Sequence, residues 1–344
     1  MRLLVLGGSV FVGRAVVAAA LARGWEVTTF NWDRSGRGPG EVERLTGDRT
    51  DPADLAVLRG RSWDAVVDTW AGRAEAVRES ASLLAGSVGH YSYVSSLMAY
   101  HWPVPRPLTE AAPLRPPSPG SRTEDYPARK AAAERAVVEV MGDRALLSRP
   151  GLVLGPWEHP GRLPRWLLRM ASATEGEPVL APGSPDRGVQ YVDVRDLAQW
   201  ILHAAGQGLG GAYNLSCPPG HATMGGLLDA CAEVTGSAGR LVRVDERWLA
   251  GTGVVPWTEL PVWVPAEGEG AGIYDVDPGV GIAAGARYRP LVETVADTWA
   301  WLRRIPAEKL GRAVRTTGWL PAEREEQVLR AWQKEKEEVV RRAR

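Results

Sequence analysis

A tyrosine and a lysine stand four residues apart in the segment Tyr126-Pro127-Ala128-Arg129-Lys130. At the start of a helix this spacing places both side chains on one face, where they project toward one point. A free tyrosine has a pKa near ~10, and a neighbouring ammonium stabilises its phenolate, so the phenol becomes usable as a general acid or base near neutral pH. Lys130 is also the only lysine in the first 300 residues of a chain that otherwise uses arginine. The pair therefore predicts proton transfer at Tyr126, although such a spacing also occurs in surface pairs.

Two serines, Ser95 and Ser96, end an apolar run over residues 91–95 that is expected to form a strand. In open α/β sheets ligands bind at the carboxyl edge, where the strands end. One serine hydroxyl at that place could donate to a substrate oxygen beside the tyrosine. Serines at strand ends are also common turn formers, so the residues alone leave this role open.

A glycine-rich turn follows the first apolar run, with the sequence Gly7-Gly8-Ser9-Val10-Phe11-Val12-Gly13. Glycine permits a tight turn and a close backbone approach, and the N-terminus of the next helix presents free N–H groups and the positive end of its dipole. A strand before the turn and a helix after it are the context that a dinucleotide-binding fingerprint requires. The turn therefore predicts a pyrophosphate site that includes Gly7, Ser9 and Gly13, although Val10 replaces the middle glycine of the usual pattern.

The end of the second predicted strand should select the cofactor, because an acidic side chain there binds the ribose diol and repels a 2′-phosphate. Asn31 occupies this place and is neutral, and Arg34 and Arg37 follow it. We therefore expect NADP(H) to be favoured over NAD(H). NAD(H) stays possible because Asp33 could accept from the diol, and both arginines could belong to a solvated loop.

Asp48 follows the third predicted strand, where its carboxylate could accept a hydrogen bond from the adenine amino group. The alternative is that Asp48 caps the helix expected to begin at Pro52. We include its neighbour Arg49 among the candidate cofactor-binding residues.

The elements that must position these residues alternate between short apolar runs and helical patterns, which is typical of a parallel sheet. Strands are expected at residues 2–6, 26–30, 42–45, 65–68, 91–95 and 145–148, and helices at residues 12–23, 52–59, 73–84 and 126–141. Six strands with crossovers predict an α/β fold in which residues 1–150 form an NAD(P)-binding, Rossmann-type doubly wound parallel sheet.

A second region follows Pro150, where the pattern loosens and tryptophan, proline and glycine become frequent. We assign residues 151–321 to a smaller C-terminal substrate-binding domain, within which residues 188–216 are expected to return to the sheet. The tail, residues 322–344, is charged and carries an apolar stripe on one face, which predicts a docked helix.

The composition limits the class of partner. The 41 basic and 41 acidic residues give a formal net charge of zero, which argues against binding nucleic acid or anionic lipid. No stretch approaches the ~20 apolar residues of a membrane span, and two cysteines alone, Cys217 and Cys231, indicate a reducing compartment. We expect a cytoplasmic protein that acts on a small molecule, with both thiols free, no metal site among its scattered histidines and a possible homodimer.

Together, these motifs resemble the short-chain dehydrogenase/reductase superfamily in its extended form, which includes nucleotide-sugar epimerases and dehydratases. The first turn is similar to that of an atypical branch with the pattern Gly-Gly-x-x-Phe-x-Gly, and the resemblance covers nearly the whole chain. It implies that Ser96 donates to the substrate oxygen, Tyr126 exchanges the proton and Lys130 holds the nicotinamide ribose. Ser96 is preferred over Ser95 because the stretch from Ser96 to Tyr100 matches the family's Ser-x-x-x-Tyr pattern.

The same resemblance implies further contacts to the cofactor. Phe11 and Val12 would offer backbone N–H groups to the pyrophosphate. Trp70 and Ala71 would flank the cofactor after the fourth strand, and Pro150 would lie against the nicotinamide. Near the domain junction, a further set resembles the family's Tyr-x-Asp segment: Tyr191, Asp193, Arg195 and Asp196.

The leading hypothesis is an NADP(H)-dependent reductase that transfers hydride to or from a polar carbonyl or secondary alcohol. A redox-neutral nucleotide-sugar epimerase with tightly held NAD needs no additional side chain and is the first alternative. A dehydratase is disfavoured because Leu97 and Met98 stand where the family's dehydratases carry an Asp-Glu pair. The second alternative is a non-catalytic relative that binds RNA or senses NADP(H), against which the zero net charge and the Ser-Tyr-Lys set argue.

A long segment, residues 98–122, contains seven prolines and connects Ser96 with Tyr126. Because both of its ends adjoin candidate catalytic residues, we expect it to cover the substrate mouth as a mobile lid. The alternative is a proline-rich surface connection.

Overall fold

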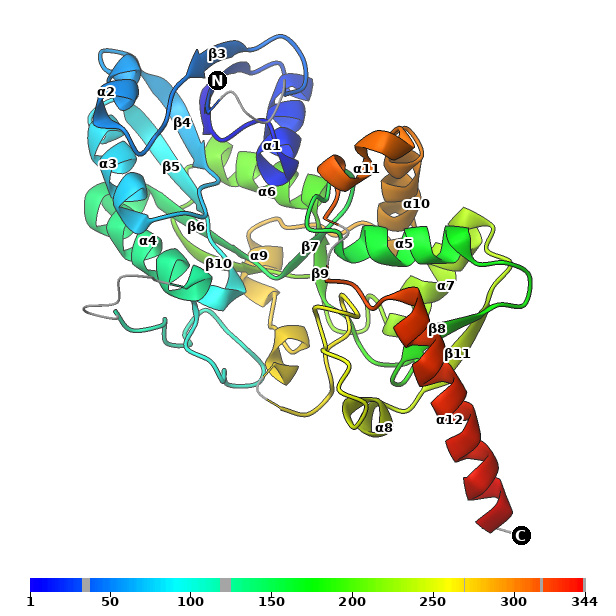
Figure 1. Ribbon diagram of the computed structural model, residues 1–344. Coiled ribbons are helices and arrows are strands. Elements are labelled where there is room, and N and C mark those ends of the chain that lie inside the picture. Colours follow the sequence, from blue (N-terminus) through cyan, green and yellow to red (C-terminus); the bar gives the residue numbers. More distant parts are fainter. Residues whose placement is uncertain (33–37, 118–124, 269, 316–317, 343–344) are drawn as a thin grey trace. The chain divides into compact units, whose positions relative to one another are not determined.

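The structure is a computed structural model that describes residues 1–32, 38–117, 125–268, 270–315 and 318–342 (Figure 1). The chain divides into two compact units. Unit 1 comprises Met1–Val153, Gln190–Pro218 and Asp275–Tyr288. Unit 2 comprises Leu154–Val189, Pro219–Tyr274 and Arg289–Arg344. In the described part of the chain, no helix is long and apolar enough to cross a membrane.

Unit 1 is built on a parallel sheet of seven strands in the order β10-β6-β5-β4-β1-β2-β3 (Figure 1). In that order the strands are β10 (Gly211–Leu215), β6 (Ala145–Pro150), β5 (Val88–Val94), β4 (Trp63–Asp68), β1 (Arg2–Leu6), β2 (Glu26–Asn31) and β3 (Glu43–Thr46). All six strands expected from the sequence are present with slightly shifted ends, and β10 is the seventh. The order reverses at β1, next to β4, and this confirms the Rossmann-type α/β fold.

Helices cover both faces of this sheet (Figure 1). On one face α1 (Phe11–Ala22) packs against α6 (Val194–Gln207), and on the other α3 (Ala74–Leu84) packs against α4 (Tyr126–Met141). The central strand β1 supplies both cores, because Leu3 and Val5 point to the α1 and α6 side while Leu4 and Leu6 point to the α3 and α4 side. Such a strand is apolar on both faces, which is why its sequence is a continuous hydrophobic run.

The remaining elements of unit 1 are short. They are α2 (Pro52–Leu55), η1 (Ala56–Leu58), η2 (Leu97–Ala99), η3 (Gly142–Arg144), β7 (Leu152–Leu154), β9 (Tyr191–Asp193) and α9 (Gly279–Ala283). Within residues 188–216, which were expected to return to the sheet, β9 pairs with β7 in a separate two-stranded sheet. The strand that joins the large sheet is β10, which follows α6. Residues 275–288, which the sequence pattern placed with the second region, belong to unit 1.

Unit 2 contains three helices that pack on one another and a pair of parallel strands. The helices are α5 (Arg162–Ser172), α7 (Met224–Thr235) and α10 (Leu291–Leu302), and the strands are β8 (Pro178–Pro182) and β11 (Arg240–Val244). Its other elements are α8 (Glu246–Ala250), η4 (Ala271–Tyr274), α11 (Ala307–Ala313) and α12 (Ala322–Arg342). The tail helix α12 buries Val328 and Leu329, and Trp332 Nε1 donates to the carbonyl of Arg243 at 2.8 Å.

The proline-rich segment after Ser96 is anchored to unit 1 by a few buried residues, whereas most of residues 101–117 are half-buried or exposed. Tyr100 and Leu108 are fully buried and share a core cluster with Leu97 and Val276. The Tyr100 hydroxyl accepts from Arg149 at 2.8 Å and donates to an amide oxygen at 2.7 Å. This packing favours the alternative of a fixed connection over the mobile lid that we expected, and residues 118–124 lie outside the described part of the chain.

Candidate active site

The turn between β1 and α1 can be formed only with glycine at its key positions. Gly7 has a φ of +99°, and a Cβ at Gly13 would lie 1.7 Å from the carbonyl oxygen of Gly7. Helix α1 begins at Phe11, whose preceding residue, Val10, has no side-chain capping bond. The absent Cβ at residue 13 lets the start of α1 pack directly against the turn, so the helix N-terminus lies beside the turn backbone, and this arrangement fits the pyrophosphate of a dinucleotide. Ser9 and Val12 belong to the same turn and are half-buried.

Asn31 lies at the end of β2, as expected, and its amide oxygen accepts from Gly8 N–H at 2.7 Å. It lines a small pocket together with Ser9, with the half-exposed Trp32 and with Arg44 of β3. Arg44 is not among the residues expected from the sequence, and it becomes a candidate only because β3 pairs with β2 beside Asn31. The expected contributions of Asp33, Arg34 and Arg37 fall on residues 33–37, outside the described residues.

Asp48 lies in the turn after β3, where its Oδ1 accepts from the N–H of Thr50 at 2.8 Å and from the Thr50 hydroxyl at 2.7 Å. The cap of α2 is Asp51, which accepts from Ala53 N–H at 2.8 Å. The alternative role proposed for Asp48, capping that helix, is therefore wrong.

Tyr126 and Lys130 share one face of α4. The helix is capped by Asp125, which accepts from Ala128 N–H at 2.9 Å, and Pro127 is in its first turn. Lys130 Nζ lies 5.8 Å from the centre of the Tyr126 ring. The tyrosine is 39% exposed whereas the lysine is 2% exposed, so the phenol faces outward and the ammonium lies in the protein interior.

The ammonium of Lys130 is held by backbone carbonyls at the carboxyl edge of the sheet. It donates to the carbonyl oxygen of Trp70 at 2.7 Å and to that of Val94 at 2.6 Å, and lies 4.7 Å from the centre of the Tyr93 ring. An ammonium has three N–H groups, and the hydrogen bonds of the described residues use two of them. Burial lowers the pKa of Lys130 to about 7, against the opposing charges of Asp68 and Glu134.

Ser96 lies where β5 ends, and caps the short helix η2, which packs against α4. Its Oγ accepts from Met98 N–H at 3.1 Å, so its hydroxyl proton can be donated to a substrate oxygen. Ser95 is also buried, and its Oγ has no hydrogen-bond partner among the described residues. The capping bond fixes the orientation of Ser96, and the preference for Ser96 over Ser95 stays a prediction.

The remaining residues of the expected cofactor surface lie at the ends of neighbouring strands. Trp70 is half-buried after β4, and Ala71 next to it is exposed and accepts from Arg129 Nε at 3.2 Å. Pro150 ends β6 and is buried. Asp193, from the expected Tyr-x-Asp segment, caps α6 by accepting from Arg195 N–H at 2.8 Å, which is a structural role.

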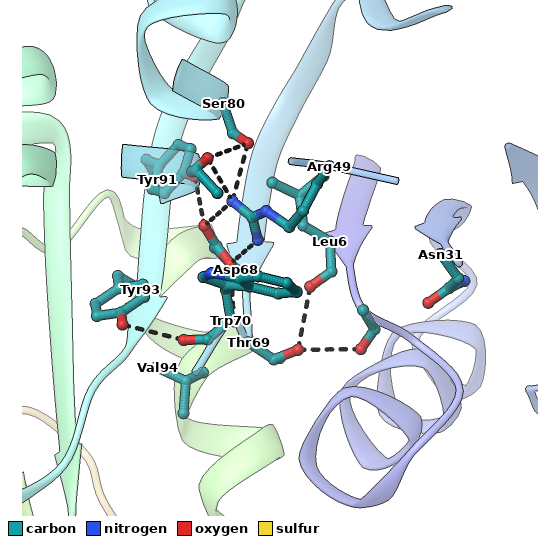
Figure 2. A network of polar contacts seen from close by, with 12 residues as sticks. Leu6, Asn31, Arg49, Asp68, Thr69, Trp70, Ser80, Tyr91, Tyr93 and Val94 are labelled. Carbon is teal, nitrogen blue, oxygen red and sulfur yellow. Dashed lines mark hydrogen bonds and ion pairs between the residues drawn. The ribbon is translucent and has the colours of Figure 1, made fainter. Parts of the chain in front are cut away.

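Arg49 does not lie on the cofactor surface. Figure 2 shows its guanidinium paired with both carboxylate oxygens of Asp68, at 2.6 and 2.8 Å, and also bonded to Ser80 at 2.9 Å. Tyr91 donates its hydroxyl to the same carboxylate at 2.8 Å. Burial opposes both charges, but the pairing outweighs it, so the pKa of Asp68 is lowered and that of Arg49 is raised.

The comparisons with known proteins decide the family. The model of the NAD dependent epimerase/dehydratase family matches residues 3–86 and 81–216, which is well over half of the chain. The chain belongs to this family. The match confirms the resemblance to the extended short-chain dehydrogenases and identifies the protein as an NAD(P)-dependent enzyme of that type. No curated protein sequence matches the chain.

Solved structures that include two UDP-glucose 4-epimerases share the fold of this family member. UDP-glucose 4-epimerase from Thermus thermophilus, in complex with NAD, is 23% identical, with a TM-score of 0.62 over 89% of this chain and 100% of that one. The Bordetella bronchiseptica enzyme WbmH, in complex with NAD+, is 20% identical, with a TM-score of 0.67 over 88% and 98%. UDP-glucose 4-epimerase from Thermotoga maritima, with UDP-glucose, is 19% identical, with a TM-score of 0.64 over 88% and 99%.

Proposed function

We propose that this epimerase/dehydratase family member is an NADP(H)-dependent oxidoreductase that acts on a polar carbonyl or secondary alcohol through Ser96, Tyr126 and Lys130. The observation that carries the proposal is the pairing on α4 of an outward-facing phenol with a buried ammonium 5.8 Å from its ring. A cation at that distance favours the phenolate, which makes Tyr126 usable as an acid and a base.

The three side chains have separate tasks in this proposal. Ser96, fixed by its bond from Met98 N–H, donates its hydroxyl proton to the substrate oxygen. Tyr126 gives or takes the proton of the same oxygen, and Lys130 stabilises the phenolate while its third N–H is directed to the ribose. When bound, the dinucleotide supplies or accepts the hydride at C4 of its nicotinamide.

The choice of NADP(H) rests on the pocket at the end of β2. Asn31 is neutral and its amide oxygen is bonded to Gly8 N–H, so it offers no negative charge against a 2′-phosphate. Arg44 lines the same pocket and is exposed. An arginine at this place can form charge-assisted hydrogen bonds with a phosphate group.

A second candidate, a redox-neutral epimerase of a nucleotide sugar with tightly held NAD, is supported by the family and by the UDP-glucose 4-epimerases that share the fold. It uses the same three side chains, because hydride leaves and returns to one substrate carbon. The two candidates differ in whether the dinucleotide exchanges with solution. Both take a small-molecule substrate.

Nucleotide analysis of the purified protein tests the choice between them. We expect mass spectrometry to find little retained nucleotide, and titration to show tighter binding of NADPH than of NADH, with an advantage that shrinks in added salt. Arg44→Ala should reduce the advantage, whereas Arg61→Ala, at another exposed arginine near β3, should not. Stoichiometric retained NAD would support the epimerase, and failure to bind any dinucleotide would contradict both candidates.

A further inference from the structure

The pocket around Lys130 contains a buried ion pair that the proposed chemistry does not use. Arg49 follows β3 and Asp68 ends β4, and their side chains are 7% and 0% exposed. Removing two charges from water is costly, and buried ion pairs are often replaceable by apolar side chains without loss of stability. The presence of this pair beside Lys130 therefore raises the question of a role other than stability.

The pair fixes the residue to which Lys130 is bonded. Asp68 Oδ1 accepts from Trp70 N–H at 2.9 Å, and the guanidinium of Arg49 lies 5.1 Å from the centre of the Trp70 ring. The Trp70 carbonyl oxygen accepts from Lys130 Nζ at 2.7 Å. The same oxygen accepts from the Tyr93 hydroxyl at 3.0 Å (Figure 2). The ion pair therefore contacts Trp70 at its backbone N–H and at its ring.

We propose that Arg49 and Asp68 are positioning residues for Lys130, in which the ion pair fixes Trp70 and the Asp68 carboxylate stabilises the ammonium beneath Tyr126. The inference rests on the proposed function, because only that function requires a protonated lysine at this place. It gives Arg49 and Asp68 a role through Lys130, with no contact to substrate or cofactor.

The charges that face Lys130 predict the direction in which its pKa moves in each variant. Within α4 these are Tyr126, Arg129 and Glu134, and from the strands and their loops they are Arg49, Asp68 and Tyr93. Burial lowers the pKa of Lys130, Asp68 and Glu134 raise it, and Arg49 and Arg129 lower it. Loss of the Asp68 charge must therefore lower the pKa of Lys130, and loss of the Arg49 charge must raise it.

The pKa of Lys130 can be measured directly, because the chain has only four lysines. We would label the lysine side chains with 13C and 15N, assign Lys130 by its absence in Lys130→Arg, and titrate its Cε signal by NMR. Asp68→Asn should lower the pKa by about one unit. Arg49→Gln should raise it, and the neutral pair Arg49→Gln/Asp68→Asn should fall between the two. The control is Glu139→Gln, on the same helix but in an exposed ion pair with Arg78, which should leave the pKa unchanged.

An unchanged or raised pKa in Asp68→Asn would overturn the inference. If that variant does not fold, Arg49→Gln decides by the same readout, and an unchanged or lowered pKa overturns it. In turnover assays, Asp68→Asn should move the basic limb of the pH profile of kcat/KM to lower pH, by the same number of pH units as the change in the pKa of Lys130. The NMR titration needs no nucleotide, so the two proposals can fail separately. If the protein binds no dinucleotide, the proposed function alone is contradicted. If it binds dinucleotide but the pKa of Lys130 does not respond to Asp68→Asn, this inference alone is contradicted.

Discussion

Two regions of unit 1 lie at the carboxyl edge of the sheet, the glycine turn and the surroundings of Lys130, and they depend on different parts of the residue. The turn from Gly7 to Gly13 is a backbone structure, whose geometry requires the absence of side chains. The surroundings of Lys130 depend on side-chain charge, because the ammonium is influenced by Asp68, which is paired with Arg49, and by Glu134, which is paired with Arg149. The first is encoded by one continuous stretch, and the second by residues from five parts of the chain.

The two regions therefore depend on their sequence in different ways. A Cβ 1.7 Å from a carbonyl oxygen cannot be accommodated by any side-chain movement, so residue 13 of the turn must be glycine. A buried charge can instead be compensated by another charge, so the lysine pocket depends on the balance of its members. We therefore expect sharp failure at the turn and graded, pH-dependent effects around Lys130.

The largest effect should come from Gly13→Ala. The added methyl group collides with the Gly7 carbonyl, so the turn must open and its N–H groups lose their direction. We expect dinucleotide affinity to fall by about 100-fold or more, a loss near ~2.7 kcal/mol. The matched control is Gly206→Ala in α6, where no heavy atom lies within 4 Å of the new methyl group. Isothermal titration measures the dinucleotide affinity of both variants. If Gly13→Ala binds the dinucleotide as tightly as the wild type does, the contrast between the turn and the surroundings of Lys130 is wrong.

The next effect concerns the second ion pair. Arg149 donates to Glu134 at 2.7 Å, and both side chains are buried. Arg149→Met leaves the carboxylate buried without its partner, and we expect the free energy of unfolding to fall by about 3–5 kcal/mol. The control is Arg78→Met, which removes an exposed arginine of α3 from its pair with Glu139, a residue on the same helix as Glu134. This variant should not change the free energy of unfolding measurably. Equal denaturation midpoints for the two variants would show that the buried charges are not energetically coupled.

A smaller effect should appear in the pH dependence of stability. The pKa of Lys130 is lowered to about 7 by burial, whereas the unfolded chain titrates near ~10.4. Between these values the unfolded state binds more protons, so stability should rise with pH relative to Lys130→Met, which lacks the titrating group. Below pH 7 the difference should be constant. Thermal unfolding of both proteins measures this difference. If their stabilities change in parallel across this pH range, the lowered pKa of Lys130 is contradicted.

The smallest effect is expected in the proline-rich segment. The amide of Leu108 donates to the carbonyl of Asp275 at 2.7 Å, and its side chain is fully buried. We expect its hydrogen exchange to be slow without ligand and little changed by nucleotide, unlike the amides of the glycine turn, which should become slower. Fast exchange that slows on binding would restore the lid hypothesis for residues 98–117.

The sequence predicted the parts that depend on local patterns. The six strands, the glycine turn and the shared face of Tyr126 and Lys130 follow from periodicity and spacing, and the structure contains all of them. The pairing of Arg49 with Asp68 joins residues 19 positions apart on different strand ends, so no local pattern indicates it. Arg44 became a candidate for the same reason, since only the pairing of β3 with β2 brings it beside Asn31.

Turnover by Tyr126→Phe tests the central claim most directly. A panel of nucleotide sugars and polar carbonyl compounds would be assayed with NADPH and NAD+ by nicotinamide absorbance and for epimerised product, first with the wild type. We predict that Tyr126→Phe abolishes turnover of any substrate found while dinucleotide affinity stays within a few-fold, because the ring still packs beside Lys130 and only the proton is lost. If the variant keeps more than about a tenth of the wild-type rate, a loss below ~1.4 kcal/mol, Tyr126 is not the acid and base of the reaction.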